Sequence, residues 1–110
     1  MEELAKGDIV TIPFPFSDLS NSKLRPALVI AVLSGNDLIL SQITSKQAKD
    51  KYSIPLHQDE FEIGTLRQES NIRPNKLFTA DYSLIKSKIG KLKEFKTKIV
   101  VEKICKIIKE

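Results

Sequence analysis

The segment Ile9–Phe16 alternates in hydropathy along its length. Four apolar side chains share one face: Val10, Ile12, Phe14 and Phe16. A period of two is that of a β-strand with one buried face. Pro13 and Pro15 lie on the other face, and proline favours an edge position because it cannot donate a hydrogen bond to a neighbouring strand. The sequence therefore predicts an edge strand near its start.

Further strand-length segments follow this first strand. The apolar run Pro26–Leu33 predicts a central strand that is covered on both faces. Ser34–Asp37 predicts a tight turn into a strand at Leu38–Thr44, so that the two strands form a hairpin. Other predicted elements are an edge strand at 52–56, a strand at 70–76, loops at 16–23 and 59–64, and a short helical turn within 76–82. Residues 84–92 fit a strand or a helix, and the alternation of apolar residues with lysines favours a strand.

After Lys93 the spacing of apolar residues becomes helical. The stripe consists of Val100, Val101, Ile104, Ile107 and Ile108. Most lysines of this segment, Lys96 among them, fall outside the stripe, and Cys105 at its border is expected to be a small packing residue. Several short strands followed by one helix predict a mainly β fold, a bent antiparallel sheet or partly open barrel with a C-terminal helix.

Length and composition narrow the classes of protein further. The 110 residues suffice for one domain, which we expect to span 1–110. No apolar run approaches the roughly 18 residues of a membrane span, and the acidic start Met1-Glu2-Glu3 does not resemble a secretory signal. We therefore expect a cytoplasmic protein with no membrane partner. A single cysteine excludes an internal disulfide and zinc sites built on paired cysteines.

Positive charge is concentrated in the last quarter of the chain. Residues 86–110 hold nine lysines and three glutamates, and the whole chain has a formal net charge of +4. Basic proteins attract phosphate backbones, because each neutralised phosphate releases counterions. A solvated, lysine-rich helix face explains the same pattern, so charge permits a nucleic-acid partner without showing one.

Several kinds of active site are excluded or disfavoured by the residues present. His57 is the only histidine, so one subunit cannot build a two-histidine ribonuclease mechanism, and its place on an edge strand predicts an exposed side chain. Asp59, Glu60 and Glu62 form an acidic cluster that fits a solvated turn better than a metal site. The chain has no glycine-rich phosphate loop, no GxSxG and no HExxH.

Arginine, lysine and hydroxyl groups are the remaining candidates for chemistry. Arg25 precedes Pro26, and proline holds the preceding residue extended. A guanidinium matches phosphate oxygens with a planar fork of donors. Thr44-Ser45-Lys46 adds two hydroxyls and an ammonium at a strand end, and Arg73 again precedes a proline. Taken singly, each is also compatible with a surface residue beside a turn.

Taken together, five segments of the chain resemble MazF/PemK-type toxins of bacterial type II toxin–antitoxin systems. They occur in the family's order and are Gly7–Val10, Phe14–Asp18, Lys23–Ile30, Gln42–Lys46 and Ser70–Thr79. The resemblance implies a small SH3-like antiparallel β-barrel decorated with helices, acting as a homodimer. It also implies a ribosome-independent endoribonuclease that cuts single-stranded RNA, chiefly messenger RNA, at a short sequence without metal or other cofactor. A cognate antitoxin would neutralise it with an extended, partly helical peptide laid across the RNA site.

The resemblance also assigns residue roles. Arg25 and Thr44 match the catalytic positions, and Ser45, Lys46, Ser70 and Arg73 would bind RNA. RNA supplies its own nucleophile, the 2′-hydroxyl, so the protein has to position it, move protons and stabilise charge. The expected products are a 2′,3′-cyclic phosphate and a 5′-hydroxyl. Some relatives carry an acid shortly after the arginine that matches Arg73, and the nearby position in this chain is Asn75, which leaves the general base open.

Two alternatives compete with a ribonuclease. A toxin of the same fold could poison DNA gyrase, although the presence of both Arg25 and Thr44 argues against it. A non-catalytic SH3-like module for peptides or RNA is the second alternative, and no aromatic groove for proline-rich peptides is visible. Tyr52, Phe61 and Phe78 could stack on RNA bases, but packing is the favoured role for each.

Overall fold

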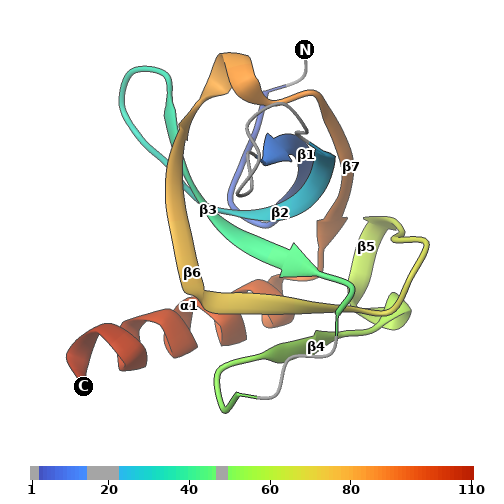
Figure 1. Ribbon diagram of the computed structural model, residues 1–110, viewed down its shortest axis with the longest axis vertical. Helices are drawn as coiled ribbons and strands as arrows, with labels where there is room; N and C mark the ends of the chain where they lie inside the picture. The colour runs from blue at the N-terminus through green and yellow to red at the C-terminus, as the bar shows by residue number, and fades with distance from the viewer. Residues whose placement is uncertain (1–2, 15–22, 47–49) are drawn as a thin grey trace.

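The fold is a strongly curled antiparallel sheet with one long helix across its outside, as the computed structural model of residues 3–14, 23–46 and 50–110 shows (Figure 1). Seven strands occur in these residues: β1 (Asp8–Phe14), β2 (Lys23–Val32), β3 (Asp37–Thr44), β4 (Ile54–Leu56), β5 (Phe61–Gly64), β6 (Ser70–Asp81) and β7 (Ser87–Leu92). Their order in the sheet is β4-β6-β3-β2-β1-β7-β5, which leaves β4 and β5 as edges of a half-barrel. Helix α1 (Glu94–Lys109) follows β7. The predicted mainly β fold with a C-terminal helix is confirmed.

Strand β2 lies in the middle of the sheet, as its apolar run predicts. Residues 27–30 are buried, and β1 and β3 pair with β2 on its two sides. The turn from β2 to β3 contains Gly35 with a φ of +80°, a conformation that glycine adopts without a steric penalty. The predicted hairpin is therefore confirmed.

Alternation along the strands divides the core into two clusters. Ile9 lies opposite Leu28, and both belong to the cluster that packs against Val100 and Ile104 of α1. Val10 lies opposite Ala27 on the other face, in a second cluster that includes Val29, Leu40 and Ile85. A fully buried aliphatic side chain of this size contributes about 1.5–3 kcal/mol, so the two clusters fix the register of the central strands.

The edge position predicted for the first strand is wrong. β1 is an interior strand, because β7 pairs with its first half, Asp8–Thr11, on the side away from β2. Pro13 lies beyond the stretch that pairs with β7, so its missing N–H costs no bond to that strand. Pro15 and Phe16, and the loop predicted at 16–23 up to Ser22, lie outside the described residues.

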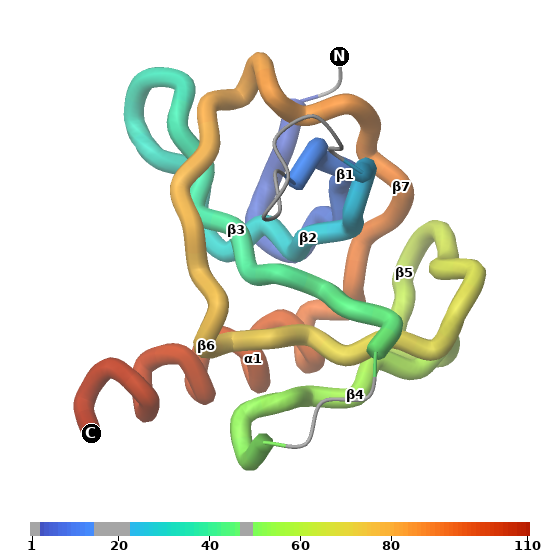
Figure 2. Tube along the Cα trace, in the orientation of Figure 1, coloured from blue at the N-terminus to red at the C-terminus, as the bar shows by residue number. Residues whose placement is uncertain are grey.

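The helical turn predicted within 76–82 is wrong, because strand β6 occupies most of this segment. The strand continues to Asp81 and bends where its register with β3 shifts, so that Ser41 faces Leu77 while Gln42 faces Arg73 (Figure 2). The buried Ser41 hydroxyl donates a 2.7 Å hydrogen bond to the carbonyl of Arg73 and so satisfies the backbone at the bend. Pro74 follows directly, at an irregularity where a strand tolerates proline. The helical turn comes later, at Tyr82–Leu84.

The loop predicted at 59–64 is also wrong. A 3₁₀ turn (Gln58–Glu60) leads into β5, which pairs with β7. Phe61 is only 8% exposed and joins the core, which gives this polar segment an apolar anchor. The edge strand predicted at 52–56 is confirmed as β4, and the strand at 84–92 as β7. His57 is exposed, as predicted.

Helix α1 has the predicted bounds and a partly different buried face. Glu94 near its start and Lys106 and Lys109 near its end complement the helix dipole. Val100 and Ile104 are buried, but Ile108 is 71% exposed and Cys105 is exposed, because the end of α1 runs out past the sheet (Figure 1). No helix in the described ranges is long and apolar enough to span a membrane.

Lys96 of α1 is buried, although the sequence periodicity placed it outside the apolar stripe. It is only 5% exposed. Its Nζ donates a 2.7 Å hydrogen bond to the carbonyl of Pro55 and lies 2.9 Å from Glu60 Oε2. A charged residue is buried in this way only where partners replace its hydration, and two such partners are present here.

Candidate functional site

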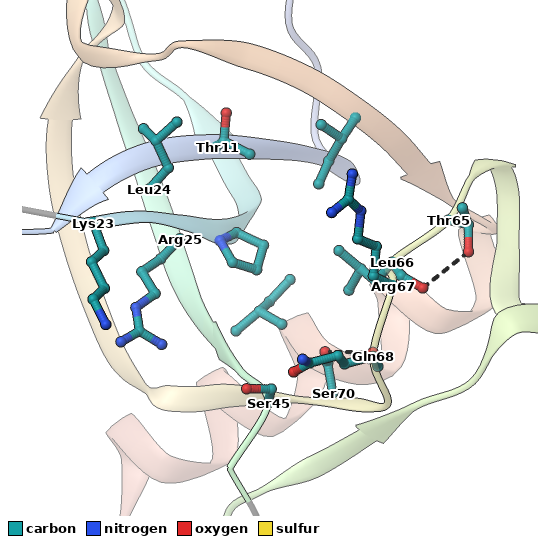
Figure 3. A pocket seen from close by; sticks show the side chains of 13 residues that line it. Thr11, Lys23, Leu24, Arg25, Ser45, Thr65, Leu66, Arg67, Gln68 and Ser70 are labelled. Atoms are coloured by element: carbon teal, nitrogen blue, oxygen red, sulfur yellow. Dashed lines mark hydrogen bonds between the residues drawn. The ribbon is translucent and has the colours of Figure 1, made fainter.

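A pocket of about 520 Å³ lies between the start of β2, the end of β3 and the connection from β5 to β6 (Figure 3). Its apolar lining is Leu24, Pro26, Ile43, Leu66 and Ile89. Its polar lining is Thr11, Lys23, Arg25, Ser45, Thr65, Arg67, Gln68 and Ser70. Three cationic side chains and no carboxylate occur among the lining residues in the described part of the chain. Such a pocket concentrates positive potential and favours an anionic ligand.

Three of the six site residues predicted from the sequence lie in this pocket: Arg25, Ser45 and Ser70. The other three, Thr44, Lys46 and Arg73, are described residues that do not line it.

The position of Arg25 follows from the pairing of β2. Arg25 is half-buried and lies opposite Ile12 of β1, while Pro26 lies opposite Thr11. Proline at position 26 keeps the preceding backbone extended, as strand geometry requires. Figure 3 shows the Arg25 side chain beside Lys23 at one side of the pocket, above Ser45.

Thr44 is related to Arg25 by the register of β2 and β3. The last registered pair at this end of the two strands is Ala27 with Gln42, and Arg25 and Thr44 each lie two residues beyond it. Side chains two residues apart on a strand point to the same face, so Arg25 and Thr44 leave the sheet on the same side. The Thr44 Oγ1 accepts a 3.1 Å hydrogen bond from the Lys46 N–H, which orients the hydroxyl oxygen within the turn after β3.

Arg73 lies on the neighbouring strand and has a protein partner. It faces Gln42 across β3 and β6, and its guanidinium pairs with the Asp50 carboxylate. Desolvation alone would raise the pKa of Asp50, but N–H groups of Tyr52 and Ser53 and the charge of Arg73 outweigh it and lower that pKa. The carboxylate therefore stays ionised beside Arg73 in neutral solution.

The pocket also contains cationic and amide groups that sequence reasoning missed. Arg67 and Gln68 come from the connection between β5 and β6, and Lys23 from the start of β2. Residues 65–69 have no hydrophobic periodicity and no motif, so their sequence gives no signal of a binding role. Lys23 lies within a segment that carries the family resemblance and could have been chosen from it.

The aromatic residues considered for base stacking make protein contacts instead. Phe61 is buried, and the rings of Phe78 and Phe14 meet edge to face at 5.0 Å between centroids. The Lys51 ammonium lies 5.4 Å from the centroid of the Tyr52 ring. Burial and the ring contact are those of packing residues for Phe61 and Phe78.

The acidic cluster shows no metal-binding geometry. No group of three or more His, Cys, Asp and Glu side chains in residues 3–14, 23–46 and 50–110 could hold a metal ion. Glu60 is engaged elsewhere, since it accepts from the His57 N–H at 2.7 Å and pairs with Lys96.

Comparison of the sequence with known families identifies the chain. The model of the PemK-like, MazF-like toxins of type II toxin–antitoxin systems matches residues 5–108. This chain belongs to that family. The match confirms the resemblance that the five segments indicate. No curated protein matches the sequence closely enough to count as a relative.

Solved structures agree with the family's fold. An endoribonuclease from Mycobacterial species in complex with its cognate antitoxin superimposes with a TM-score of 0.75 at 7% identity, covering 97% of this chain and 96% of that one. The Mycobacterium tuberculosis toxin MazF-mt6 gives 0.70 at 16% identity, covering 93% and 96%. A further endoribonuclease from Mycobacterial species gives 0.72 at 10% identity, covering 99% and 94%. At such low identities, the similarity between this MazF/PemK chain and these structures is one of fold.

Proposed function

We propose that this MazF/PemK-family toxin is an endoribonuclease that cuts single-stranded RNA at a short sequence. The observation that carries the proposal is the position of Arg25 in a cationic pocket whose described lining residues include no carboxylate. RNA brings its own nucleophile in the 2′-hydroxyl, so cleavage needs positioning and charge stabilisation and can proceed without a metal ion. Two structures of similar fold are endoribonucleases by name, which supports the same reaction.

Arg25 contacts the scissile phosphate in this proposal. Its planar fork of donors stabilises the additional negative charge that develops as the 2′-oxygen attacks the phosphorus and the 5′-oxygen leaves. The reaction yields a 2′,3′-cyclic phosphate and a 5′-hydroxyl. A guanidinium keeps its proton at neutral pH, so the group that accepts the 2′-hydroxyl proton is a different one.

Thr44 is the second catalytic residue that we propose. It leaves the sheet on the same side as Arg25, so its hydroxyl can hydrogen-bond the phosphate or the 2′-oxygen while Arg25 holds the phosphate. Ser45 and Ser70 line the pocket and are proposed to bind the RNA backbone. Lys46 and Arg73 are proposed to bind RNA that runs on beyond the pocket, over the ends of β3 and β6.

The partners belong to the same proposal. A cognate antitoxin is one partner, since the endoribonuclease of similar fold was solved with its own antitoxin. A homodimer is the proposed assembly. A second pocket, of about 400 Å³, is lined by Phe14, Phe78 and the exposed apolar side chains Leu77 and Leu84, and it offers an apolar surface to a second copy. We further propose that residues 1–110 act as a single toxin domain in the cytoplasm.

Cleavage of a long single-stranded RNA by the purified protein in EDTA tests the function. We expect cuts at a recurring short sequence, with cyclic phosphate and 5′-hydroxyl ends. Loss of cleavage in EDTA would refute the metal-free reaction. Intact RNA together with trapped, cleaved DNA in a gyrase reaction would instead support the gyrase poison, which the fold neighbours do not favour.

A further inference from the structure

The pocket has two chemically different sides. Lys23 and Arg25 come from β2, and residues 65–68 form the opposite side, here called the 65–68 wall. Figure 3 shows Arg25 and Arg67 at opposite sides of the opening, with Ser45, Gln68 and Ser70 along one border. If Arg25 holds the scissile phosphate, the 65–68 wall faces the part of the nucleotide that lies across the pocket from it.

The backbone of the 65–68 wall is held at both ends. The Gln58 side chain donates to the carbonyl of Gly64 at 3.2 Å and accepts from the Thr65 hydroxyl. At the other end the Ser70 hydroxyl donates to the carbonyl of Gln68 at 3.0 Å. Leu66 packs against the core. The wall is therefore a fixed part of the pocket, which lowers the ordering cost of binding.

The Arg67 and Gln68 side chains are exposed on this fixed backbone. Sequence-specific proteins read single-stranded RNA by hydrogen bonds to the edges of unstacked bases and by stacking on apolar, aromatic or guanidinium surfaces. The pocket offers both, since Pro26, Leu66 and Ile89 give it an apolar lining. Its volume of about 520 Å³ lies within the range of roughly 300–1,000 Å³ of small-molecule sites, enough for one base.

The identity of the two side chains indicates which bases fit. A guanidinium pairs with O6 and N7 of guanine, and a carboxamide pairs with N6 and N7 of adenine. Both pairings use an edge that only purines have. We propose that Arg67 and Gln68 form a purine subsite that sets the sequence preference of the ribonuclease, an inference that rests on the function proposed above.

A role for Arg67 as a second phosphate contact makes a different prediction. Loss of a phosphate contact weakens binding almost equally for all sequences, and a lysine restores much of it because charge is what matters. Loss of a base contact relaxes preference at one position, and a lysine lacks the rigid planar fork that holds a base edge in one geometry.

Mapping the cut sites of the wild type, Arg67→Ala, Arg67→Lys and Gln68→Ala on one long RNA separates these roles. The wild type is expected to cut at sites that share a purine at one fixed position. In Arg67→Ala and Arg67→Lys the preference at that position is expected to fall by about 10- to 100-fold, the discrimination of one bidentate base contact. Gln68→Ala is expected to change the ratio of adenine to guanine there. Lys109→Ala, at the exposed end of α1, is the control and should match the wild type.

Three outcomes would overturn the purine subsite. One is a wild-type enzyme whose sites share no purine. Another is that both Arg67 variants cut the same sites as the wild type in the same relative proportions. Wild-type preference in Arg67→Lys together with its loss in Arg67→Ala would count against the subsite in the same way. The third is a wild type that cuts no RNA, which refutes the proposed function itself and with it this subsite. The first two leave the proposed function intact, so the two failures are distinguishable.

Discussion

Lys96 of α1 and Glu60 of the turn before β5 form an ion pair of 2.9 Å, with both side chains largely buried. The same ammonium also bonds the carbonyl of Pro55 in β4. One side chain thus joins the helix to β4 and to the turn before β5. That turn also contains Gln58, which holds the 65–68 wall of the pocket.

Replacing Lys96 by methionine removes the charge and keeps the length of the side chain. Glu60 then loses its cationic partner, so we expect the free energy of unfolding to fall by about 2–3 kcal/mol, the value of a charged hydrogen bond whose partner stays buried. Denaturation in urea measures the change. Lys98→Met on the exposed side of α1 is the matched control, with an expected change within about 0.5 kcal/mol. Equal stability of the two variants would show that the buried ion pair contributes nothing.

The same pair predicts a dependence of stability on pH. Desolvation would raise the pKa of Glu60, but hydrogen bonds from the His57 N–H and Lys96 outweigh it, and the folded-state pKa lies below the ordinary value of 4.5. A lowered folded-state pKa gives stability that is present above the unfolded-state pKa and is lost as the pH falls through the folded-state pKa. Glu60→Gln should therefore be less stable than the wild type at neutral pH, and the difference should shrink below about pH 4. A difference in the free energy of unfolding between the wild type and Glu60→Gln that stays constant down to pH 2 would contradict this account.

Two glycines provide a matched pair of substitutions. Gly64 and Gly35 have φ values of +81° and +80°, but a Cβ on Gly64 would lie 2.2 Å from the carbonyl oxygen of Ile89, whereas one on Gly35 would meet nothing within 4 Å. Gly35→Ala is expected to cost about 1–2 kcal/mol for the left-handed backbone alone. Gly64→Ala adds a clash and should cost about 1–3 kcal/mol more. Thermal unfolding compares the two variants, and equal losses would show that β5 and β7 do not approach as closely as described.

Asp50 is expected to compete with RNA for Arg73. Its ion pair with Arg73 is partly exposed and therefore screened by solvent, so Asp50→Asn should have a stability close to that of the wild type. If Arg73 binds RNA as proposed, removing the carboxylate frees the guanidinium and should tighten binding of a non-cleavable single-stranded RNA. Fluorescence anisotropy at fixed salt measures the affinity. An unchanged affinity in Asp50→Asn would indicate that Arg73 serves only the structure.

The sheet could be predicted largely from the sequence because its strands alternate cleanly or are apolar throughout. The apolar run at Pro26–Leu33 identified β2, and the turn at Ser34–Asp37 identified the hairpin. The bend of β6 could not be predicted, since it depends on a shift in register with β3 and on the Ser41 hydrogen bond. Pairing between strands that are distant in the sequence decides such features, and no local pattern reports it.

The candidate site was predictable only in part for the same reason. Arg25 stands in a motif, but Arg67 and Gln68 lie in an aperiodic connection that tertiary structure brings to the pocket. Lys96 is a related case, because a buried lysine is recognisable only once Glu60 and Pro55 are seen beside it. The sequence therefore indicated the β2 side of the pocket and missed the opposite side.

Single-turnover cleavage of an RNA that contains one cut site, with the wild type, Arg25→Ala and Arg25→Lys, tests the central claim most directly. Loss of one preorganised donor to a developing charge typically lowers the rate by about 10²–10³-fold, and we expect at least that for Arg25→Ala in a protein with wild-type stability. Arg25→Lys keeps the charge and loses the planar fork, so it should also be strongly impaired. A folded Arg25→Ala variant that cuts at the wild-type rate would show that Arg25 is not in the active site.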